Sequence, residues 1–321
     1  MTEHTVMVSD HDFADLSIER DVLGDIADVR DAGGDLDAED DIDADLVDAD
    51  AILNLRYEIN GDLIRRLDGC RIVARYGIGV DNVDSEAATE EGIYVTNVPD
   101  YCQEEVATHA LSLLLALYRG LTRYDDSVAA GEWERAVAAP IHRLSTQTLG
   151  IVGFGAIGRA VADRALALGF DIVTSDPYVD AETAGDHGAD LVEFETLLER
   201  SDAVTIHSPL VEATRGMFDA AAFERMNDGA VLVNVARGPI VDGDALRAAL
   251  DAGKIRGAGL DVFPDEPPAV DDPLRTHERV VATPHVGWYS EEANAERRRR
   301  AAENVRAALT GERPENVVNE L

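Results

Sequence analysis

The hexapeptide GFGAIG, residues 153–158, constrains the fold more than any other stretch of the sequence. It follows the apolar run TLGIV at 148–152 and precedes a segment with helical periodicity. Between a strand and a helix, such glycines allow a tight turn, close approach of the backbone to a pyrophosphate, and close helix–strand packing. The hexapeptide therefore predicts a dinucleotide-binding βαβ unit, and a glycine turn without a ligand is the alternative. The residues expected to contact the dinucleotide are Gly153, Gly155, Ala156, Ile157 and Gly158.

An acidic residue at the end of the next apolar run indicates which dinucleotide to expect. Asp176 ends the run FDIVTSD and lies eighteen residues after Gly158. A carboxylate at this place accepts hydrogen bonds from the ribose hydroxyls and repels a 2′-phosphate. Because Pro177 and Tyr178 follow, no arginine is adjacent to bind such a phosphate. We therefore expect NAD as the cofactor rather than NADP.

Short β-branched runs alternate with longer helical patterns along the chain, which predicts an α/β fold with doubly wound parallel sheets. One long helix is expected at 103–124. We expect a Rossmann NAD-binding domain at 100–287, inserted into a flavodoxin-like substrate domain formed by residues 1–99 and 288–321, with a ligand cleft between the domains. The expected strands are 5–9, 51–55, 71–76, 148–155, 170–176, 203–207, 230–236, 257–263 and 280–285.

The chain is strongly acidic. Its 64 aspartates and glutamates outnumber 28 basic residues, of which Lys254 is the only lysine, and the net charge is −36. Fifteen aspartates lie in the first fifty residues, and an acidic interaction tail is one interpretation. Because acidic residues are spread over the whole chain, we favour the composition typical of extreme halophiles, in which salt screens the repulsion. The run of four arginines at 297–300 is flanked by glutamates and is expected to form a solvated, ion-paired helix face.

The same composition excludes several classes of function. A net charge of −36 argues against binding to the phosphates of nucleic acid. No apolar run reaches the roughly 20 residues that a membrane span requires, and the N-terminal residues lack the pattern of a signal peptide. The two cysteines, Cys70 and Cys102, form no motif. These observations are typical of a reduced, cytoplasmic protein.

Three apolar runs of the second half end near charged or titratable residues: Arg237, Glu266 and His285. The carboxyl ends of parallel strands are where ligands bind. An imidazolium can protonate a carbonyl oxygen that gains charge as hydride arrives, a carboxylate can orient that imidazolium and raise its pKa, and a guanidinium can hold a carboxylate. Taken singly, the arginine could form a surface ion pair, the glutamate could be a loop carboxylate, and the histidine could be core packing or a metal ligand. No metal is expected, since no second His or Cys lies at ligand spacing.

These residues and their spacing resemble the D-isomer-specific 2-hydroxyacid dehydrogenase family. Arg237 precedes Glu266 by 29 residues, and Glu266 precedes His285 by 19. The resemblance runs from the loop YGIGVDNVD at 76–84 to the last helical segment. It implies reversible hydride transfer between NADH and the carbonyl carbon of a 2-oxoacid, with His285 as the proton donor.

The resemblance implies further site residues. The backbone of Gly77, Ile78 and Gly79 would bind the substrate carboxylate as an anion nest, and an ordinary glycine turn is the alternative. Asp261 would contact the nicotinamide carboxamide, and Val106 would line the nicotinamide pocket. The remaining residues implied to contact the cofactor are His207, Ser208, Val235 and Ala236.

The segment HVGWYSEE resembles the branch of the family that contains the C-terminal binding proteins and phosphoglycerate dehydrogenase-like enzymes. In that branch Arg75 would meet the substrate carboxylate, and Trp288 could pack on the substrate side chain or only at a domain junction. Val106 and Ser208 stand where the C-terminal binding proteins have threonine and cysteine, which leaves the substrate open. Phosphoglycerate, glyoxylate and hydroxypyruvate are among the candidates.

Two further points follow from the resemblance. An NAD(H)-sensing scaffold or corepressor with little turnover is the alternative to an enzyme. The family also implies a homodimer, formed through the helix expected at 103–124 and the segment 125–146.

Overall fold

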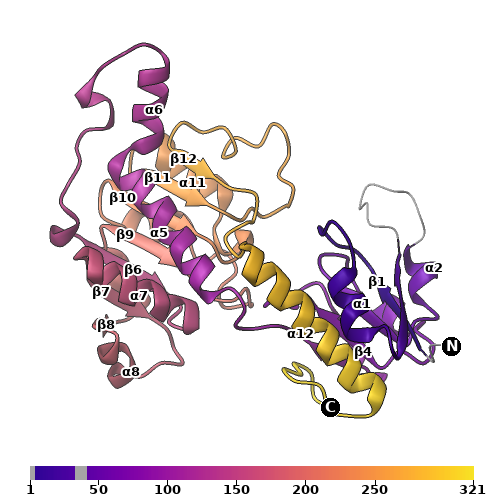
Figure 1. The fold of residues 1–321 in the computed structure, drawn as a ribbon. Helices are drawn as coiled ribbons and strands as arrows, with labels where there is room; N and C mark the ends of the chain where they lie inside the picture. Colours follow the sequence, from indigo (N-terminus) through magenta and orange to yellow (C-terminus); the bar gives the residue numbers. More distant parts are fainter. Residues whose placement is uncertain (1–3, 33–41) are drawn as a thin grey trace. The chain divides into compact units, whose positions relative to one another are not determined.

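The structure, a computed structural model, describes residues 4–32 and 42–321. Contacts between Cα atoms divide the chain into two compact units. One unit combines Met1–Tyr101 with Ser290–Leu321, and the other is Cys102–Tyr289. Both are layered α/β structures built around parallel sheets, as Figure 1 shows. No helix in the described part of the chain is long and apolar enough to cross a membrane.

The first unit contains a five-stranded parallel sheet in the order β2-β1-β3-β4-β5. This is the flavodoxin-like strand order, so the fold expected for this part of the chain is confirmed. The strands are β1 His4–Val8, β2 Ala27–Asp31, β3 Ala51–Asn54, β4 Ile72–Arg75 and β5 Tyr94–Thr96. The helices are α1 Ser17–Leu23, α2 Ile42–Leu46, α3 Gly61–Ile64, α4 Ser85–Glu90 and α12 Glu291–Thr310.

Helix α12 brings the end of the chain back onto the first unit, where it packs against α1 and β4. The expectation of a solvated face at 297–300 is wrong for two of the four arginines. Arg297 and Arg298 are only 1% and 6% exposed. The guanidinium of Arg298 donates to both carboxylate oxygens of the fully buried Glu19, at 2.9 and 2.6 Å. A buried arginine requires such a partner, and the sequence between the two residues is too long for local patterning to reveal the pairing.

The second unit contains a seven-stranded parallel sheet in the order β12-β11-β10-β9-β6-β7-β8. The chain starts in the middle at β6, winds outward to β8, and then returns across β6 to β12, which is the Rossmann arrangement. The strands are β6 Thr148–Val152, β7 Asp171–Ser175, β8 Ala189–Leu191, β9 Ala203–Ile206, β10 Ala230–Asn234, β11 Ile255–Leu260 and β12 Val280–Ala282. Strands β9 and β10 are buried along their whole length, as expected where helices cover both faces of a sheet.

Several helices pack against this second sheet (Figure 1), and the unit also contains short 3₁₀ turns. The α-helices are α5 Gln103–Arg119, α6 Leu121–Ala129, α7 Ala156–Leu168, α8 Ala181–Asp186, α9 Phe194–Arg200, α10 Ala220–Arg225 and α11 Gly243–Asp251. The 3₁₀ turns are η1 Arg135–Ala138, η2 Leu144–Thr146 and η3 Gly238–Ile240.

The single helix expected at 103–124 is two helices in the structure. Gly120 separates α5 from α6 and has a left-handed φ of 60°. A Cβ atom at this position would lie 2.3 Å from the Cβ of Ala138. Glycine is therefore required both by the backbone conformation and by the close approach of η1.

Candidate active site

The glycine turn joins the carboxyl end of β6 to the start of α7. Gly153 has φ 88°, and a Cβ there would lie 2.6 Å from the backbone nitrogen of Ser208. A Cβ on Gly158 would lie 2.2 Å from the carbonyl oxygen of Gly153. By contrast, a Cβ on Gly155 would meet no atom within 4 Å. Two glycines are thus needed for packing, and the third leaves open space at a helix start, which fits a pyrophosphate.

The carboxylate of Asp176 is held beside this turn. Its Oδ2 accepts a hydrogen bond from the backbone N–H of Phe154 at 2.7 Å, and its Oδ1 accepts one from Tyr178 at 2.8 Å. Each carboxylate oxygen can accept further hydrogen bonds. Asp176 is therefore fixed after the end of β7, close to Gly155. From this position its carboxylate could reach the ribose of a dinucleotide whose pyrophosphate lies at Gly155.

The ends of β9 and β10 line the same edge of the sheet. His207 follows β9, its Nε2 lies 2.9 Å from Thr205 Oγ1, and burial lowers its pKa to about 3, so the ring is neutral at pH 7. The hydroxyl of Ser208 is buried and has no hydrogen-bond partner among the described residues. An orphaned hydroxyl beside the glycine turn fits a polar ligand. The apolar residues predicted to line the site are Val106 and Val235, both buried, and the half-buried Ala236.

His285 and Glu266, which the sequence predicts to act as an acid–base pair, lie within hydrogen-bond distance of each other. They follow the adjacent strands β12 and β11, and His285 Nδ1 lies 2.6 Å from Glu266 Oε2. Oε1 of the same carboxylate accepts from the backbone N–H of Phe263 at 3.1 Å. Burial acts to raise the pKa of Glu266, but the hydrogen bond and charge of His285, with smaller effects of Phe263 and Arg237, hold it below its usual range. The carboxylate thus stays ionised and orients the ring through Nδ1, which leaves Nε2 for a substrate.

Arg237 lies close to this pair. It precedes η3 at the end of β10, and its charge is one of the effects that lower the pKa of Glu266. Its Nη1 donates to the carbonyl of Ala236 at 2.7 Å. A Cβ on the next residue, Gly238, would lie 2.0 Å from the backbone of Phe263. The glycine allows the loop with Arg237 to lie against the loop with Glu266, so the structure brings the three predicted catalytic residues together.

The turn that carries His285 is held in place by hydrogen bonds to the carboxylate of Asp261, and we call this arrangement the clamp. His285 has φ 54°, a conformation that costs a non-glycine residue free energy. Asp261 is 2% exposed, and its Oδ1 accepts from Thr283 Oγ1 at 2.6 Å and from Val286 N at 2.9 Å. Its Oδ2 accepts from Gly287 N at 2.8 Å. Both oxygens therefore hold the turn, and a contact of Asp261 with the cofactor stays a prediction.

Two residues of this clamp were not identified from the sequence. Thr283 bridges Asp261 to helix α5, where the Nε2 of His109 lies 2.9 Å from Thr283 Oγ1. The pairing spans 174 residues, so no local pattern reveals it. Trp288 contributes from the other side, since its Nε1 donates to the carbonyl of His285 at 3.0 Å. In the structure Trp288 supports the turn, and its contact with a substrate stays a prediction.

The predicted substrate loop lies in the first unit, after β4. The guanidinium of Arg75 donates to the carbonyls of Gly79 and Leu55. The carbonyls of Gly77 and Ile78 accept from Val98 N at 3.1 Å and Asn97 Nδ2 at 2.7 Å. In the described part of the chain, the three N–H groups of residues 77–79 make no hydrogen bond. These free N–H groups fit the predicted nest for an anion.

Comparison with known proteins agrees with this geometry. Residues 111–287 match the family described as the D-isomer specific 2-hydroxyacid dehydrogenase, NAD binding domain. The chain belongs to this family. The match covers the glycine turn and all three of Arg237, Glu266 and His285, so the resemblance noted from their spacing is confirmed.

Several relatives are named enzymes. The chain is 41% identical over 274 residues to D-3-phosphoglycerate dehydrogenase of Methanocaldococcus jannaschii, covering 85% of this chain and 52% of that one. It is 42% identical over 249 residues to the chloroplastic D-3-phosphoglycerate dehydrogenase 2 of Arabidopsis thaliana, covering 78% of this chain and 40% of that one. It is 41% identical to glyoxylate reductase of Korarchaeum cryptofilum, covering 85% of this chain and 83% of that one. The chain thus spans about half the length of the phosphoglycerate dehydrogenases.

Solved structures match over nearly the whole chain. D-lactate dehydrogenase of Aquifex aeolicus, complexed with NAD and lactic acid, has a TM-score of 0.90 at 27% identity and covers 99% of both chains. The TT0316 protein of Thermus thermophilus has a TM-score of 0.87 at 32% identity and covers 98% of this chain and 99% of its own. The doubly wound α/β fold expected from the sequence is therefore confirmed as the fold that these solved structures share.

Proposed function

We propose that the chain is an NAD-dependent D-2-hydroxyacid dehydrogenase, which transfers hydride reversibly between NADH and the carbonyl carbon of a 2-oxoacid. The observation that carries the proposal is the His285–Glu266 pair, with 2.6 Å between Nδ1 and Oε2 at the ends of adjacent strands. The names of the relatives, which include phosphoglycerate dehydrogenase, glyoxylate reductase and D-lactate dehydrogenase, support it. The intact set of Arg237, Glu266 and His285 favours an enzyme over the scaffold that the sequence left open.

Each catalytic residue has a distinct role in this proposal. The nicotinamide, when bound, supplies or accepts the hydride. His285 donates a proton from Nε2 to the carbonyl oxygen of the 2-oxoacid, or removes it from the hydroxyl in the reverse direction. Glu266 holds Nδ1–H and stabilises the imidazolium. Arg237 attracts the developing negative charge and the substrate carboxylate.

We propose that Cys102–Tyr289 serves the cofactor and that the first unit serves the substrate, with domain boundaries near those expected at 100–287, 1–99 and 288–321. Gly155 and the start of α7 bind the pyrophosphate, and Asp176 binds the ribose and disfavours NADP. The N–H groups of residues 77–79 bind the substrate carboxylate, with Arg75 holding the loop in place. The other proposed contacts are the cofactor contacts of Ala156, Ile157, His207, Ser208, Val235, Ala236, Val106 and Asp261, and the substrate contact of Trp288.

The assembly and setting of the enzyme are also proposals. Leu121, Val128 and Trp133 are 56%, 52% and 88% exposed, and they support a homodimer formed through α5, α6 and the segment that ends at η2. The buried cysteines Cys70 and Cys102 form no disulfide in the described part of the chain, which is consistent with a reducing cytoplasm. The net charge of −36 supports a halophilic protein.

The direct test is oxidation of NADH in molar KCl with a panel of 2-oxoacids that includes glyoxylate, pyruvate, hydroxypyruvate and one phosphorylated member. We expect turnover of at least one acid, slower turnover with NADPH, and weaker activity in low salt. Tight binding of NADH without turnover of any acid would contradict the enzyme and support the scaffold.

A further inference from the structure

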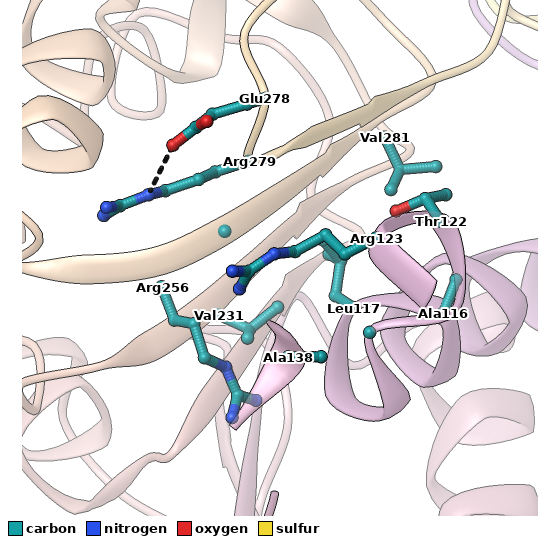
Figure 2. Close-up of a pocket in the computed structure, with 12 residues that line it drawn as sticks. Ala116, Leu117, Thr122, Arg123, Ala138, Val231, Arg256, Glu278, Arg279 and Val281 are labelled. Carbon is teal, nitrogen blue, oxygen red and sulfur yellow. Dashed lines mark ion pairs between the residues drawn. The ribbon is translucent and has the colours of Figure 1, made fainter. Parts of the chain in front are cut away.

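Helix α5 packs along strand β11 in a regular register. A Cβ on Gly259 would lie 2.9 Å from the Cβ of Leu113, and a Cβ on Gly257 would lie 3.0 Å from a methyl group of Leu117, so the two glycines allow the close packing. Leu117 and Arg256, the second residue of β11, line one narrow hollow at the amino end of the strand (Figure 2). The helix therefore runs from the carboxyl end of β11 towards its amino end.

The same register places His109 opposite Asp261. Four helix residues and two strand residues each advance by about 6–7 Å. His109 lies four residues before Leu113, and Asp261 lies two residues after the glycine that Leu113 approaches. The Nε2 atom of His109 lies 2.9 Å from Thr283 Oγ1 and 3.4 Å from Asp261 Oδ1. The contact therefore joins α5 to the residues that follow β11 and β12.

The direction of these hydrogen bonds fixes the proton on the histidine. Burial acts to raise the pKa of Asp261, but hydrogen bonds from His109, Thr283 and two backbone N–H groups hold it below its usual range. An ionised carboxylate only accepts hydrogen bonds, so the Thr283 hydroxyl donates its proton to Asp261, at 2.6 Å. The Thr283 oxygen is then the acceptor for His109, whose Nε2 must carry a proton. His109 therefore begins a chain of hydrogen bonds that ends on the Asp261 carboxylate.

The carboxylate of Asp261 can accept a further hydrogen bond. Within the described chain, Oδ1 accepts from two groups at distances below 3 Å, whereas Oδ2 accepts from Gly287 N alone, at 2.8 Å. A carboxylate oxygen has about two acceptor positions, so Oδ2 can also accept from the amide of a nicotinamide, the contact proposed above. Val106, the other nicotinamide contact proposed on α5, lies three residues before His109 and so on the same side of the helix.

We propose that His109 is a positioning residue for hydride transfer, which acts through Thr283 and Asp261 to hold the nicotinamide of the bound cofactor in place. The proposal rests on the dehydrogenase activity proposed above. In this role His109 touches no reacting atom. Because a displacement of about 1 Å can slow a reaction about a hundredfold, loss of the contact should slow the transfer more than it weakens cofactor binding.

The test is single-turnover oxidation of NADH by an excess of the full chain, followed by stopped-flow absorbance with a 2-oxoacid that the wild type reduces. The rate constant reports only enzyme that is folded and loaded, whereas a loss of folded enzyme lowers only the amplitude. His109→Leu removes the donor and should lower the rate constant by roughly ten- to a hundredfold, with the NADH dissociation constant changed by less than about threefold. His109→Gln restores an N–H at a similar reach and should recover most of the rate constant.

Two further variants complete the comparison. His109→Asn keeps a polar amide that is too short to reach Thr283, so it should be as slow as His109→Leu, and it replaces the leucine variant if that variant does not fold. His277→Gln is the matched control, because it removes another histidine beside an aspartate, with 3.3 Å between its Nε2 and Asp251 Oδ1, before the start of β12. It should keep the wild-type rate constant.

The two proposals fail in different ways. Absence of turnover by the wild type with every 2-oxoacid would refute the dehydrogenase, and the role of His109 with it. Wild-type turnover with an unchanged rate constant in His109→Leu or His109→Asn would overturn the role of His109 alone, and so would a glutamine variant no faster than the asparagine variant. A fall in amplitude alone would show that His109 supports only the fold.

Discussion

At the scale of single residues, the site depends on a few groups whose neighbours fix their charge and direction. Glu266 remains ionised because His285 and Arg237 offset its burial. His285 is held in a left-handed backbone conformation, which is unfavourable for a residue other than glycine. These three residues could be proposed from the sequence because they follow apolar runs at the spacing of the family, whereas the positive φ of His285 could not be predicted, because it is imposed by contacts distant in the chain.

A neutral, buried histidine makes stability depend on pH. The folded pKa of His207 is about 3, below the unfolded value of about 6.5, so between these values only the unfolded chain binds the proton. The free energy of unfolding should therefore fall as pH decreases from 6 to 5, by about 1 kcal/mol more than in His207→Asn. Denaturant unfolding without cofactor at these two pH values measures it.

A matched control is His142→Gln, which removes an exposed histidine and should keep the wild-type dependence on pH. Equal slopes for the wild type and His207→Asn would show that His207 is not held neutral in the fold.

At the scale of elements, the central strands and the turns after them could be predicted, as could the edge strand β12, but the other three edge strands could not. Strands β2, β5 and β8 were missed, and all three are edge strands in the structure. An edge strand is short and can carry polar residues, as in ADVRD of β2, so its apolar signal is weak. The break at Gly120 was missed because a glycine inside a helical pattern is often tolerated, and here η1 decides the outcome.

Substitutions in the glycine turn should distinguish the glycine that is needed for packing from the glycine that leaves space for the cofactor. Gly155→Ala should leave Tm near the wild-type value, since its Cβ meets no atom within 4 Å, but should weaken NADH binding at least tenfold because the methyl group occupies the space for the pyrophosphate. Gly158→Ala should instead lower Tm, since its Cβ would lie 2.2 Å from a carbonyl oxygen. Calorimetry and fluorescence titration measure the two effects, and unchanged NADH affinity in Gly155→Ala would contradict the assignment.

The clamp under the His285 turn should act on turnover rather than on cofactor binding. Thr283→Val keeps the shape of the side chain but removes the hydroxyl that links Asp261 to His109. We expect kcat to fall roughly tenfold through displacement of His285, with little change in NADH affinity. Thr283→Ser should restore most of kcat. Failure of serine to do better than valine would show that the hydroxyl does not position the turn.

At the scale of the whole molecule, charge is the dominant feature. A net charge of −36 over 321 residues opposes the compact state at low ionic strength. The Debye length shortens from about 10 Å at 0.1 M salt to about 3 Å at 1 M, which removes most repulsion between distant surface carboxylates. The composition predicts a dependence on salt, but it could not show that Arg297 and Arg298 lie buried within the first unit.

Salt should therefore stabilise the protein strongly. Between 0.1 and 2 M KCl we expect Tm to rise by roughly 5 °C or more, which corresponds to about 2 kcal/mol for a domain of this size. Differential scanning calorimetry at fixed pH and NADH concentration measures the change. A Tm that is independent of KCl, or that decreases with it, would contradict the halophilic interpretation.

The measurement that tests the central claim most directly compares turnover and NADH binding in His285→Gln with those of the wild type, for a 2-oxoacid that the wild type reduces. Glutamine fills much of the same space but cannot serve as an acid at neutral pH, so kcat should fall by about 10²–10⁴, while the NADH dissociation constant changes little. Turnover close to the wild-type rate with NADH still bound would contradict the assignment of His285 as the proton donor.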